Sequence, residues 1–88
     1  MVYFLYILRN IHNRLYIGQT SNLEQRMNDH KNHHGAKFVK DYGDFELVYT
    51  EQFQTRKDAM QREKQLKHWT VVKKEALICG DLDLLKRL

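Results

Sequence analysis

Two side chains that can bind an anion lie four residues apart in a segment that favours a helix. Arg26 and His30 have this spacing, which places both side chains on one helix face, one turn apart. Two neighbouring groups that are cationic, or can become so, repel each other slightly and favour an anion between them. The same spacing is more often typical of an exposed polar face, so its meaning depends on the residues around it.

A carboxylate interrupts the apolar face of a second helix, predicted over residues 55–68. Glu63 lies among positions that are expected to share one side of this helix: Ala59, Met60, Leu66 and Trp69. An unpaired carboxylate on such a face is costly unless a cation or hydrogen-bond donors meet it. The spacing favours a pair with Lys67, one turn further on. The alternative is a carboxylate that binds a metal ion.

Two tyrosines and a glycine lie on neighbouring predicted strands. Tyr6 and Tyr16 are expected to be core or half-buried aromatic residues on paired strands. Gly18 follows within the second strand, where a glycine marks either a bulge or a place where a ligand comes close to the backbone. We expect Gly18 to leave room for a ligand.

The histidines do not predict a structural zinc site. His30, His33 and His34 are close together, with Cys79 far along the chain. Zinc sites usually combine two well-spaced pairs of ligands, and Cys79 has no second ligand nearby.

The patterns predict three strands and three helices, followed by a short last helix. Strands are expected at 2–8, 14–19 and 45–53, because these runs are rich in aromatic and branched residues or alternate in polarity. Helices are expected from Ser21, Thr55 and Thr70, each of which is a suitable N-cap. Gly80 is expected to end the third helix, and Asp81 to begin the last one.

This order of strand, strand, helix, strand, helix, helix predicts the α+β class. A small three-stranded antiparallel sheet would be flanked by the helices. We expect one domain over residues 1–79 and a short helical tail over 80–88. The 88 residues suffice for one such domain, and no apolar run is long enough to span a membrane. One cysteine suits a reducing cytoplasm.

Positive charge is concentrated in residues 56–74. The chain has a net charge of +4, and this segment holds seven of its basic residues: Arg56, Lys57, Arg62, Lys64, Lys67, Lys73 and Lys74. Such a segment is either a solvated helix face or a surface that contacts the phosphates of a nucleic acid.

Taken together, these residues resemble the GIY-YIG nuclease family, especially its small single-domain bacterial branch. Phe4-Leu5-Tyr6 corresponds to the first motif and Tyr16-Ile17-Gly18 to the second. Arg26, His30 and Glu63 match the later positions of the family in order, and the resemblance covers roughly residues 2–78.

The resemblance implies a DNA endonuclease that uses a divalent cation, Mg²⁺ or Mn²⁺. Glu63 would bind the cation, Arg26 would bind the scissile phosphate, and Tyr16 would activate or orient the attacking water. His30 would relay the proton, and Tyr6 would hold the water or Tyr16 in line. Gly18, Arg62, Lys64 and Lys67 are expected to contact the substrate.

Two positions depart from the family pattern. Phe4 replaces the glycine of the first motif, and Gln19 stands where some members carry lysine. We expect no separate DNA-binding domain of the kind that larger relatives carry. Two alternatives therefore stay open: a nucleic-acid-binding module with little turnover, or a helper subunit that a protein partner activates.

Overall fold

The structure is a computed structural model that describes the backbone of residues 1–31 and 45–88 and the side chains of residues 1–28 and 45–88. Its elements are the strands β1 (Tyr3–Asn10), β2 (Leu15–Thr20) and β3 (Phe45–Phe53), and the helices α1 (Leu23–Lys31), α3 (Arg56–Lys67), α4 (Val71–Cys79) and α5 (Leu82–Arg87). The predicted α+β class and element order are confirmed, with the short C-terminal helix in addition.

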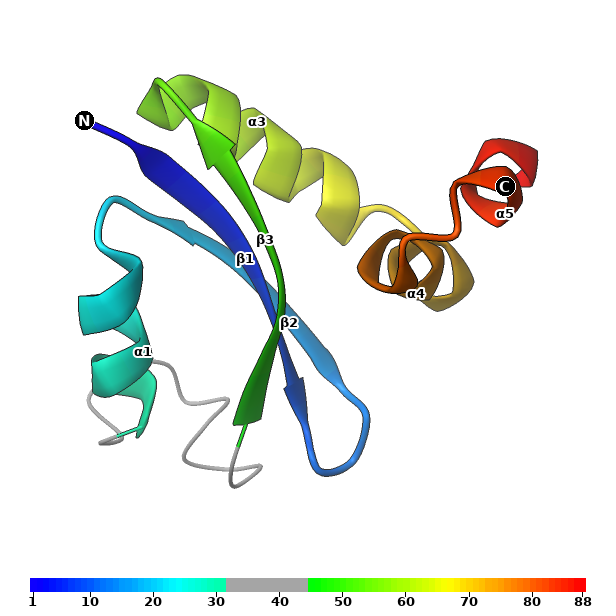
Figure 1. Cartoon of the computed structure of the whole chain (residues 1–88), viewed down its shortest axis with the longest axis horizontal. Coiled ribbons are helices and arrows are strands. Elements are labelled where there is room, and N and C mark those ends of the chain that lie inside the picture. The colour runs from blue at the N-terminus through cyan, green and yellow to red at the C-terminus, as the bar shows by residue number, and fades with distance from the viewer. Residues whose placement is uncertain (32–44) are drawn as a thin grey trace.

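The three strands form one antiparallel sheet in the order β2-β1-β3. β1 lies in the centre, and its residues Leu5 to Leu8 are all buried, at 0–1% exposure. A central strand is covered on both faces, which explains a continuous apolar run in place of strict alternation. In Figure 1, α1 lies on one side of the strands, and α3, α4 and α5 lie on the other.

The alternation predicted for β3 is interrupted. Tyr49 pairs with Ile7, but the next residue of β1, Leu8, pairs with Leu47, so β3 carries one extra residue at this point. Such a bulge reverses the faces to which the following side chains point. As a result Val48 and Tyr49 both pack against the core, whereas Leu47 is 38% exposed.

The main core lies between the sheet and α3. Leu5, Ile7 and Ile17 of the sheet form a cluster with Leu66 of α3, and Trp69 packs against this cluster. Ala59 and Leu66 are fully buried, as their helical spacing predicts. Met60 was expected to extend this apolar face, but the residue is 51% exposed, so the buried part of the face does not include it.

Side-chain caps set the helix ends. Thr55, Thr70 and Asp81 each accept a hydrogen bond from the backbone N–H three residues later, as predicted for α3, α4 and α5. Gly80 ends α4 with a φ of 75°, a conformation that glycine adopts without strain.

The cap of α1 differs from the prediction by one residue. Ser21 was expected to cap this helix, but the Asn22 side chain accepts the hydrogen bond from the Gln25 N–H, at 3.0 Å. The Asn22 N–H in turn donates to the hydroxyl oxygen of Thr20, at the end of β2. The helix therefore begins at Leu23 and is tied directly to the strand that precedes it. Within the described ranges, no helix is long and apolar enough to cross a bilayer.

Candidate active site

The phenol of Tyr6 lies over Gly18. The two residues are direct partners in the pairing of β1 with β2, so their Cα atoms are neighbours across the sheet. A Cβ added to Gly18 would lie 2.5 Å from the Tyr6 hydroxyl oxygen and 2.6 Å from the ring carbon that bears it. The absent side chain of Gly18 thus makes room for Tyr6, and the expectation that this room is kept for a ligand is corrected.

Tyr16 of β2 is a second tyrosine beside Tyr6. Because Tyr16 pairs with Leu8 while Gly18 pairs with Tyr6, the side chains of these residues lie on the same face of the sheet. The ring centroids of Tyr6 and Tyr16 are 6.3 Å apart, with the planes tilted by 34°. Tyr6 is buried, whereas Tyr16 is half-buried and in contact with solvent. Of the two phenols, Tyr16 is therefore the one that a solute can reach.

Arg26 approaches Tyr6 from α1. The Thr20–Asn22–Gln25 hydrogen bonds fix the start of this helix against the end of β2, and Arg26 follows one turn later. Its guanidinium lies close enough to the Tyr6 phenol to lower the pKa of that group through its charge and a hydrogen bond. Arg26 also lines a small hollow of about 210 Å³ at the start of α1.

Glu63 approaches the same group from α3. Its negative charge raises the pKa of the Tyr6 phenol slightly, less than burial and Tyr16 do. The Glu63 side chain is 23% exposed, and its carboxylate accepts a hydrogen bond from the Lys67 ammonium at 2.7 Å. The ion pair expected from the spacing of these two residues is confirmed.

Burial dominates the electrostatics of Tyr6. The loss of water around this side chain, followed by the charge of Tyr16 when ionised, raises its pKa to about 12, although Arg26 opposes the shift. Tyr6 therefore keeps its proton at any pH at which a cell works, and its hydroxyl acts as a hydrogen-bond donor and not as a base.

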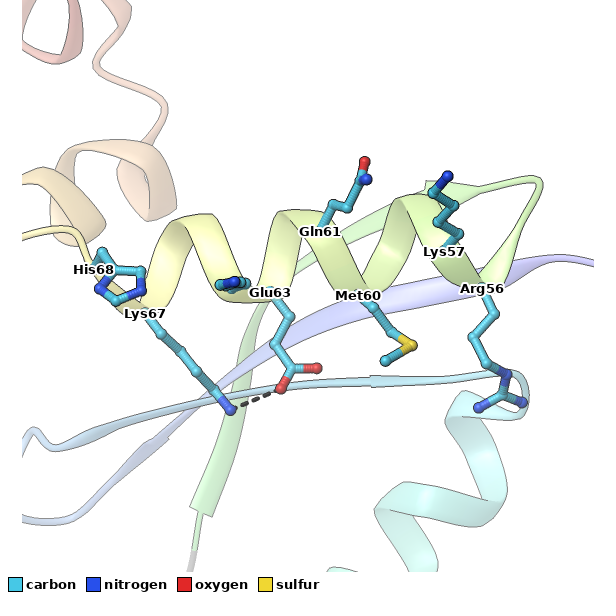
Figure 2. Close-up of a pocket in the computed structure, with 8 residues that line it drawn as sticks. Arg56, Lys57, Met60, Gln61, Glu63, Lys67 and His68 are labelled. Atoms are coloured by element: carbon cyan, nitrogen blue, oxygen red, sulfur yellow. Dashed lines mark hydrogen bonds and ion pairs between the residues drawn. The ribbon is translucent and has the colours of Figure 1, made fainter.

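A hollow of about 730 Å³ runs along the exposed flank of α3, a volume within the range of sites that bind small ligands. It is lined by four cationic residues, one carboxylate and three other side chains: Arg56, Lys57, Lys64, Lys67, Glu63, Met60, Gln61 and His68. Figure 2 shows that Arg56, Met60 and Glu63 leave the helix on one side, and Lys57 and Gln61 on the opposite side. The hollow thus places Glu63 among cations.

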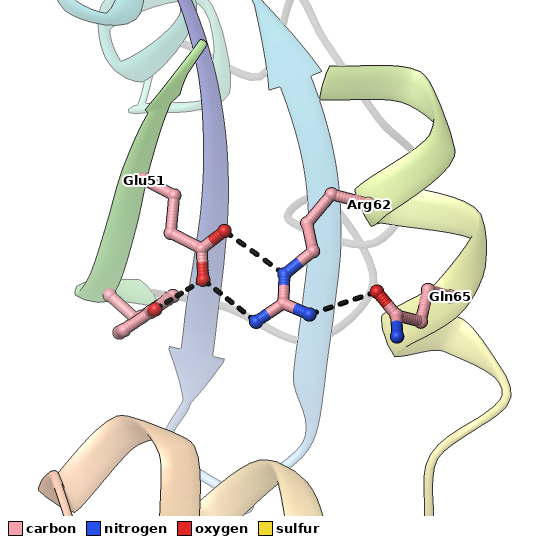
Figure 3. Close-up of polar contacts among 4 residues, drawn as sticks. Glu51, Arg62 and Gln65 are labelled. Atoms are coloured by element: carbon pink, nitrogen blue, oxygen red, sulfur yellow. Dashed lines mark hydrogen bonds and ion pairs between the residues drawn. The ribbon is translucent and has the colours of Figure 1, made fainter. Parts of the chain in front are cut away.

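Lys64 and Lys67, expected at the substrate, line this hollow, but Arg62 does not. The Arg62 guanidinium binds both carboxylate oxygens of Glu51 on β3, at 3.0 and 3.1 Å, and also donates to Gln65 (Figure 3). It lies over the Trp69 ring as well, 5.3 Å from the centroid. These contacts join α3 to the sheet and hold the Arg62 side chain away from the hollow.

The basic segment 56–74 is divided by the helix geometry. Lys73, like Arg62, lies over the Trp69 ring, with its ammonium 4.3 Å from the ring centroid. Arg56 and Lys57 line the hollow, although neither was among the predicted substrate contacts. The signal that would have identified them is their spacing from Lys64, since Lys57 precedes it by two helical turns.

Of the five residues predicted for the active site, Tyr6 and Tyr16 lie together, and the charges of Arg26 and Glu63 both act on the Tyr6 phenol. The fifth, His30, belongs to α1, but its side chain lies outside the described residues, as do His33 and His34.

The donors present suit a hard divalent cation that keeps most of its water. Glu63 is a single carboxylate with accessible surface, in a hollow that four cationic residues also line. Mg²⁺ is commonly held by one or two carboxylates together with water and substrate phosphates. Among the residues whose side chains are described, His, Cys, Asp and Glu form no cluster of three or more that could hold a metal ion.

Comparison with known proteins identifies the family. Residues 2–75 match the sequence profile of the GIY-YIG catalytic domain. The chain belongs to the GIY-YIG family. This family consists of nucleases, and the cluster around Tyr6 lies within the matched residues.

Similar GIY-YIG proteins have comparable lengths. The UPF0213 protein NP_0776A of Natronomonas pharaonis is 37% identical over 79 residues, which cover 90% of this chain and 93% of that protein. The UPF0213 protein CPE1444 of Clostridium perfringens is 40% identical over 75 residues, which cover 85% of this chain and 81% of that protein.

Two NMR structures of similar proteins show the same fold. The UPF0213 protein BH0048 of Bacillus halodurans has a TM-score of 0.59 and 34% identity, over 90% of this chain and 84% of that one. The protein EF2693 of E. faecalis has a TM-score of 0.63 and 27% identity, over 93% of this chain and 88% of that one. This GIY-YIG chain is thus similar to small proteins over most of their length.

Proposed function

We propose that the chain is an endonuclease that hydrolyses phosphodiester bonds in DNA and depends on a divalent cation. The observation that carries this proposal is that Tyr16 lies beside the buried phenol of Tyr6 and that the charges of Arg26 and Glu63 act on the same phenol. These residues come from three different elements, β2, α1 and α3. A protein that only bound nucleic acid would need positive charge, but it would not need this set of phenols, guanidinium and carboxylate.

Arg26 is the residue that binds the scissile phosphate. A guanidinium donates two parallel hydrogen bonds to phosphate oxygens, and it stabilises the negative charge that grows on them in the transition state. The hydrogen bond with Tyr6 orients the guanidinium before substrate arrives.

Tyr16 is the residue that orients or activates the attacking water. It is the more accessible phenol of the pair and lies beside Tyr6. A phenol with the usual pKa of about 10 is a weak base at neutral pH, so cationic neighbours must assist it. His30 relays the proton away, a role that suits the pKa range of imidazole.

Tyr6 serves as a neutral donor that positions its neighbours. Its raised pKa keeps the hydroxyl protonated, so it can donate to the Tyr16 oxygen or to a water but cannot accept the proton of the reaction. Burial holds the ring in one position against Gly18, which is the property that a positioning residue needs.

Glu63 is the residue that holds the cation, Mg²⁺ or Mn²⁺. When bound, such an ion neutralises charge on the phosphate and lowers the pKa of water. The hollow beside Glu63 supplies the substrate contacts, since its cationic residues can replace the counterions of a nucleic acid. We expect this activity in a reducing cytoplasm, which a chain with one cysteine, Cys79, suits.

A cleavage assay over single-stranded, duplex and branched DNA, with RNA alongside, tests the proposal. The chain should cut at least one DNA in Mg²⁺ or Mn²⁺ and none in excess chelator. Glu63→Gln should abolish cutting while the fold is kept, because the change removes charge but almost no volume.

Two results would contradict the assignment. Undiminished cutting by Glu63→Gln would remove Glu63 from the cation site. Binding of DNA without cutting in either metal would instead favour a binding module, or a helper subunit that requires a protein partner.

A further inference from the structure

We propose that Lys67 competes with the divalent cation for the carboxylate of Glu63 and thereby lowers the affinity of the empty site for metal. This inference rests on the proposed role of Glu63 as the metal ligand. It assigns to Lys67 a control of metal binding, in addition to any contact that Lys67 makes with nucleic acid.

The geometry of the pair supports this competition. The Lys67 ammonium lies 2.7 Å from one carboxylate oxygen of Glu63, with both residues on the same side of α3, one turn apart (Figure 2). Among the residues with described side chains, no second cation forms a recorded ion pair with Glu63. Lys67 is thus the cation that occupies this carboxylate.

The surroundings make the pair reversible. The Lys67 side chain is 54% exposed, and that of Glu63 is 23% exposed, so water reaches both groups. An exposed pair with this spacing is weak, because solvent screens the charges and two long side chains lose freedom when they are held together. A divalent cation can therefore displace the ammonium.

Displacement of the Lys67 ammonium requires free energy, which reduces the net free energy of metal binding. Binding at the carboxylate requires that the hydrogen bond to Lys67 be broken, and a positive charge then remains within the same hollow as Lys64, Lys57 and Arg56. A ligand that must first displace another has a weaker apparent affinity, in proportion to the fraction of sites that are free. Removal of the ammonium should therefore tighten metal binding.

Binding of Mn²⁺, followed by the electron paramagnetic resonance signal of the free ion in the absence of nucleic acid, tests this inference. Lys67→Gln should bind Mn²⁺ about two- to five-fold more tightly than the parent chain, the range expected for an exposed ion pair. Lys67→Arg keeps a cation beside Glu63 and should bind Mn²⁺ as weakly as the parent.

Lys64→Gln is the matched control, because it removes the same charge from the same helix and hollow. Lys64 has no recorded ion pair with Glu63 in the described part of the chain, so this change should tighten Mn²⁺ binding by less than about two-fold. If Lys67→Gln tightened binding no more than Lys64→Gln, general electrostatic attraction would explain the effect and the inference would be overturned.

Failure of the inference can be told apart from failure of the proposed function. If the parent cuts DNA with Mn²⁺, Glu63→Gln does not, and Lys67→Gln binds Mn²⁺ like the parent, only the competition is wrong. If Glu63→Gln binds Mn²⁺ as tightly as the parent, Glu63 is not the ligand, and the metal assignment and the competition are both overturned.

Discussion

The Tyr6 phenol occupies the space that a side chain at Gly18 would need, and the two residues are partners across β1 and β2. The aromatic ring of the first motif and the glycine of the second motif thus form one structural unit. Because Tyr6 is 1% exposed, its ring cannot move aside without disturbing the core.

Gly18→Ala should lower the free energy of unfolding by about 1–3 kcal/mol, the usual cost of overpacking a filled core. The added Cβ would overlap the Tyr6 ring at 2.5–2.6 Å. In a Tyr6→Ala background, where the ring is gone, the same change should cost little. Urea unfolding of the four proteins measures this coupling. An equal cost in both backgrounds would show that the Gly18 backbone, and not the ring, imposes the glycine.

Tyr16→Phe separates catalysis from packing, because it keeps the ring and deletes only the hydroxyl. We expect the rate of cutting to fall about 100-fold or more, the range of acid–base groups, with little change in stability. Single-turnover rates at saturating DNA measure the loss. A folded Tyr16→Phe protein that cuts as fast as the parent would leave Tyr16 with a packing role.

His30→Ala should cause a milder loss of rate than Tyr16→Phe. If His30 relays the proton, the change should also alter the pH dependence of cutting between about pH 6 and 8. A pH–rate profile that keeps its shape would contradict the relay.

Arg26→Ala should lower the rate of cutting far more than the affinity for DNA. The contact of a guanidinium with the scissile phosphate strengthens as charge develops in the transition state, so its loss affects the barrier more than the ground state. Single-turnover rates and equilibrium binding, measured on the same DNA, separate the two effects. If only binding weakened, Arg26 would be a contact to the DNA backbone and not a catalytic residue.

Lys64→Gln should weaken binding to all DNA sequences alike and reduce the salt dependence of binding by up to about one unit of slope. Lys86→Gln is a control, since Lys86 belongs to α5 and is not one of the residues that line the hollow on α3. Arg62→Gln should leave the slope unchanged but lower the free energy of unfolding by about 1–2 kcal/mol, because Glu51 would lose its cationic partner and keep only the Tyr49 hydroxyl. Equal slopes for Lys64→Gln and Lys86→Gln would argue against the hollow as the binding surface.

The chain should lose stability at alkaline pH. Burial raises the pKa of Tyr6 to about 12, and burial with a hydrogen bond to Glu51 does the same for Tyr49. An unfolded tyrosine has a pKa of about 10, so between pH 10 and 12 the folded chain retains protons that the unfolded chain releases. The free energy of unfolding therefore falls as pH rises through this range.

Tyr6→Phe should remove the part of this alkaline loss of stability that is due to Tyr6. Between pH 8 and pH 11 the variant should lose about 1 kcal/mol less than the parent. Urea unfolding at the two pH values measures the difference. An equal loss in both proteins would show that Tyr6 ionises as readily in the folded chain as in the unfolded one.

The sequence by itself determined the elements and their order, because these depend on local signals. Period-two and continuous apolar runs predicted all three strands, and Thr55, Thr70 and Gly80 predicted helix ends that the structure confirms. The cap of α1 was displaced by one residue because Ser21 and Asn22 are both good caps, and the hydrogen bond to Thr20 decides between them. The resemblance between motifs also identified the family.

Only the tertiary structure decided which residues meet. Tyr6 and Gly18 lie twelve residues apart, and the strand register makes them partners. The sequence therefore did not show that Gly18 leaves room for the Tyr6 ring. Arg62 and Lys64 are near neighbours in one basic segment, but two residues on a helix differ by about 200° in direction. One therefore binds Glu51 on β3 while the other lines the hollow, because pairing across the fold depends on direction and register and not on distance along the chain.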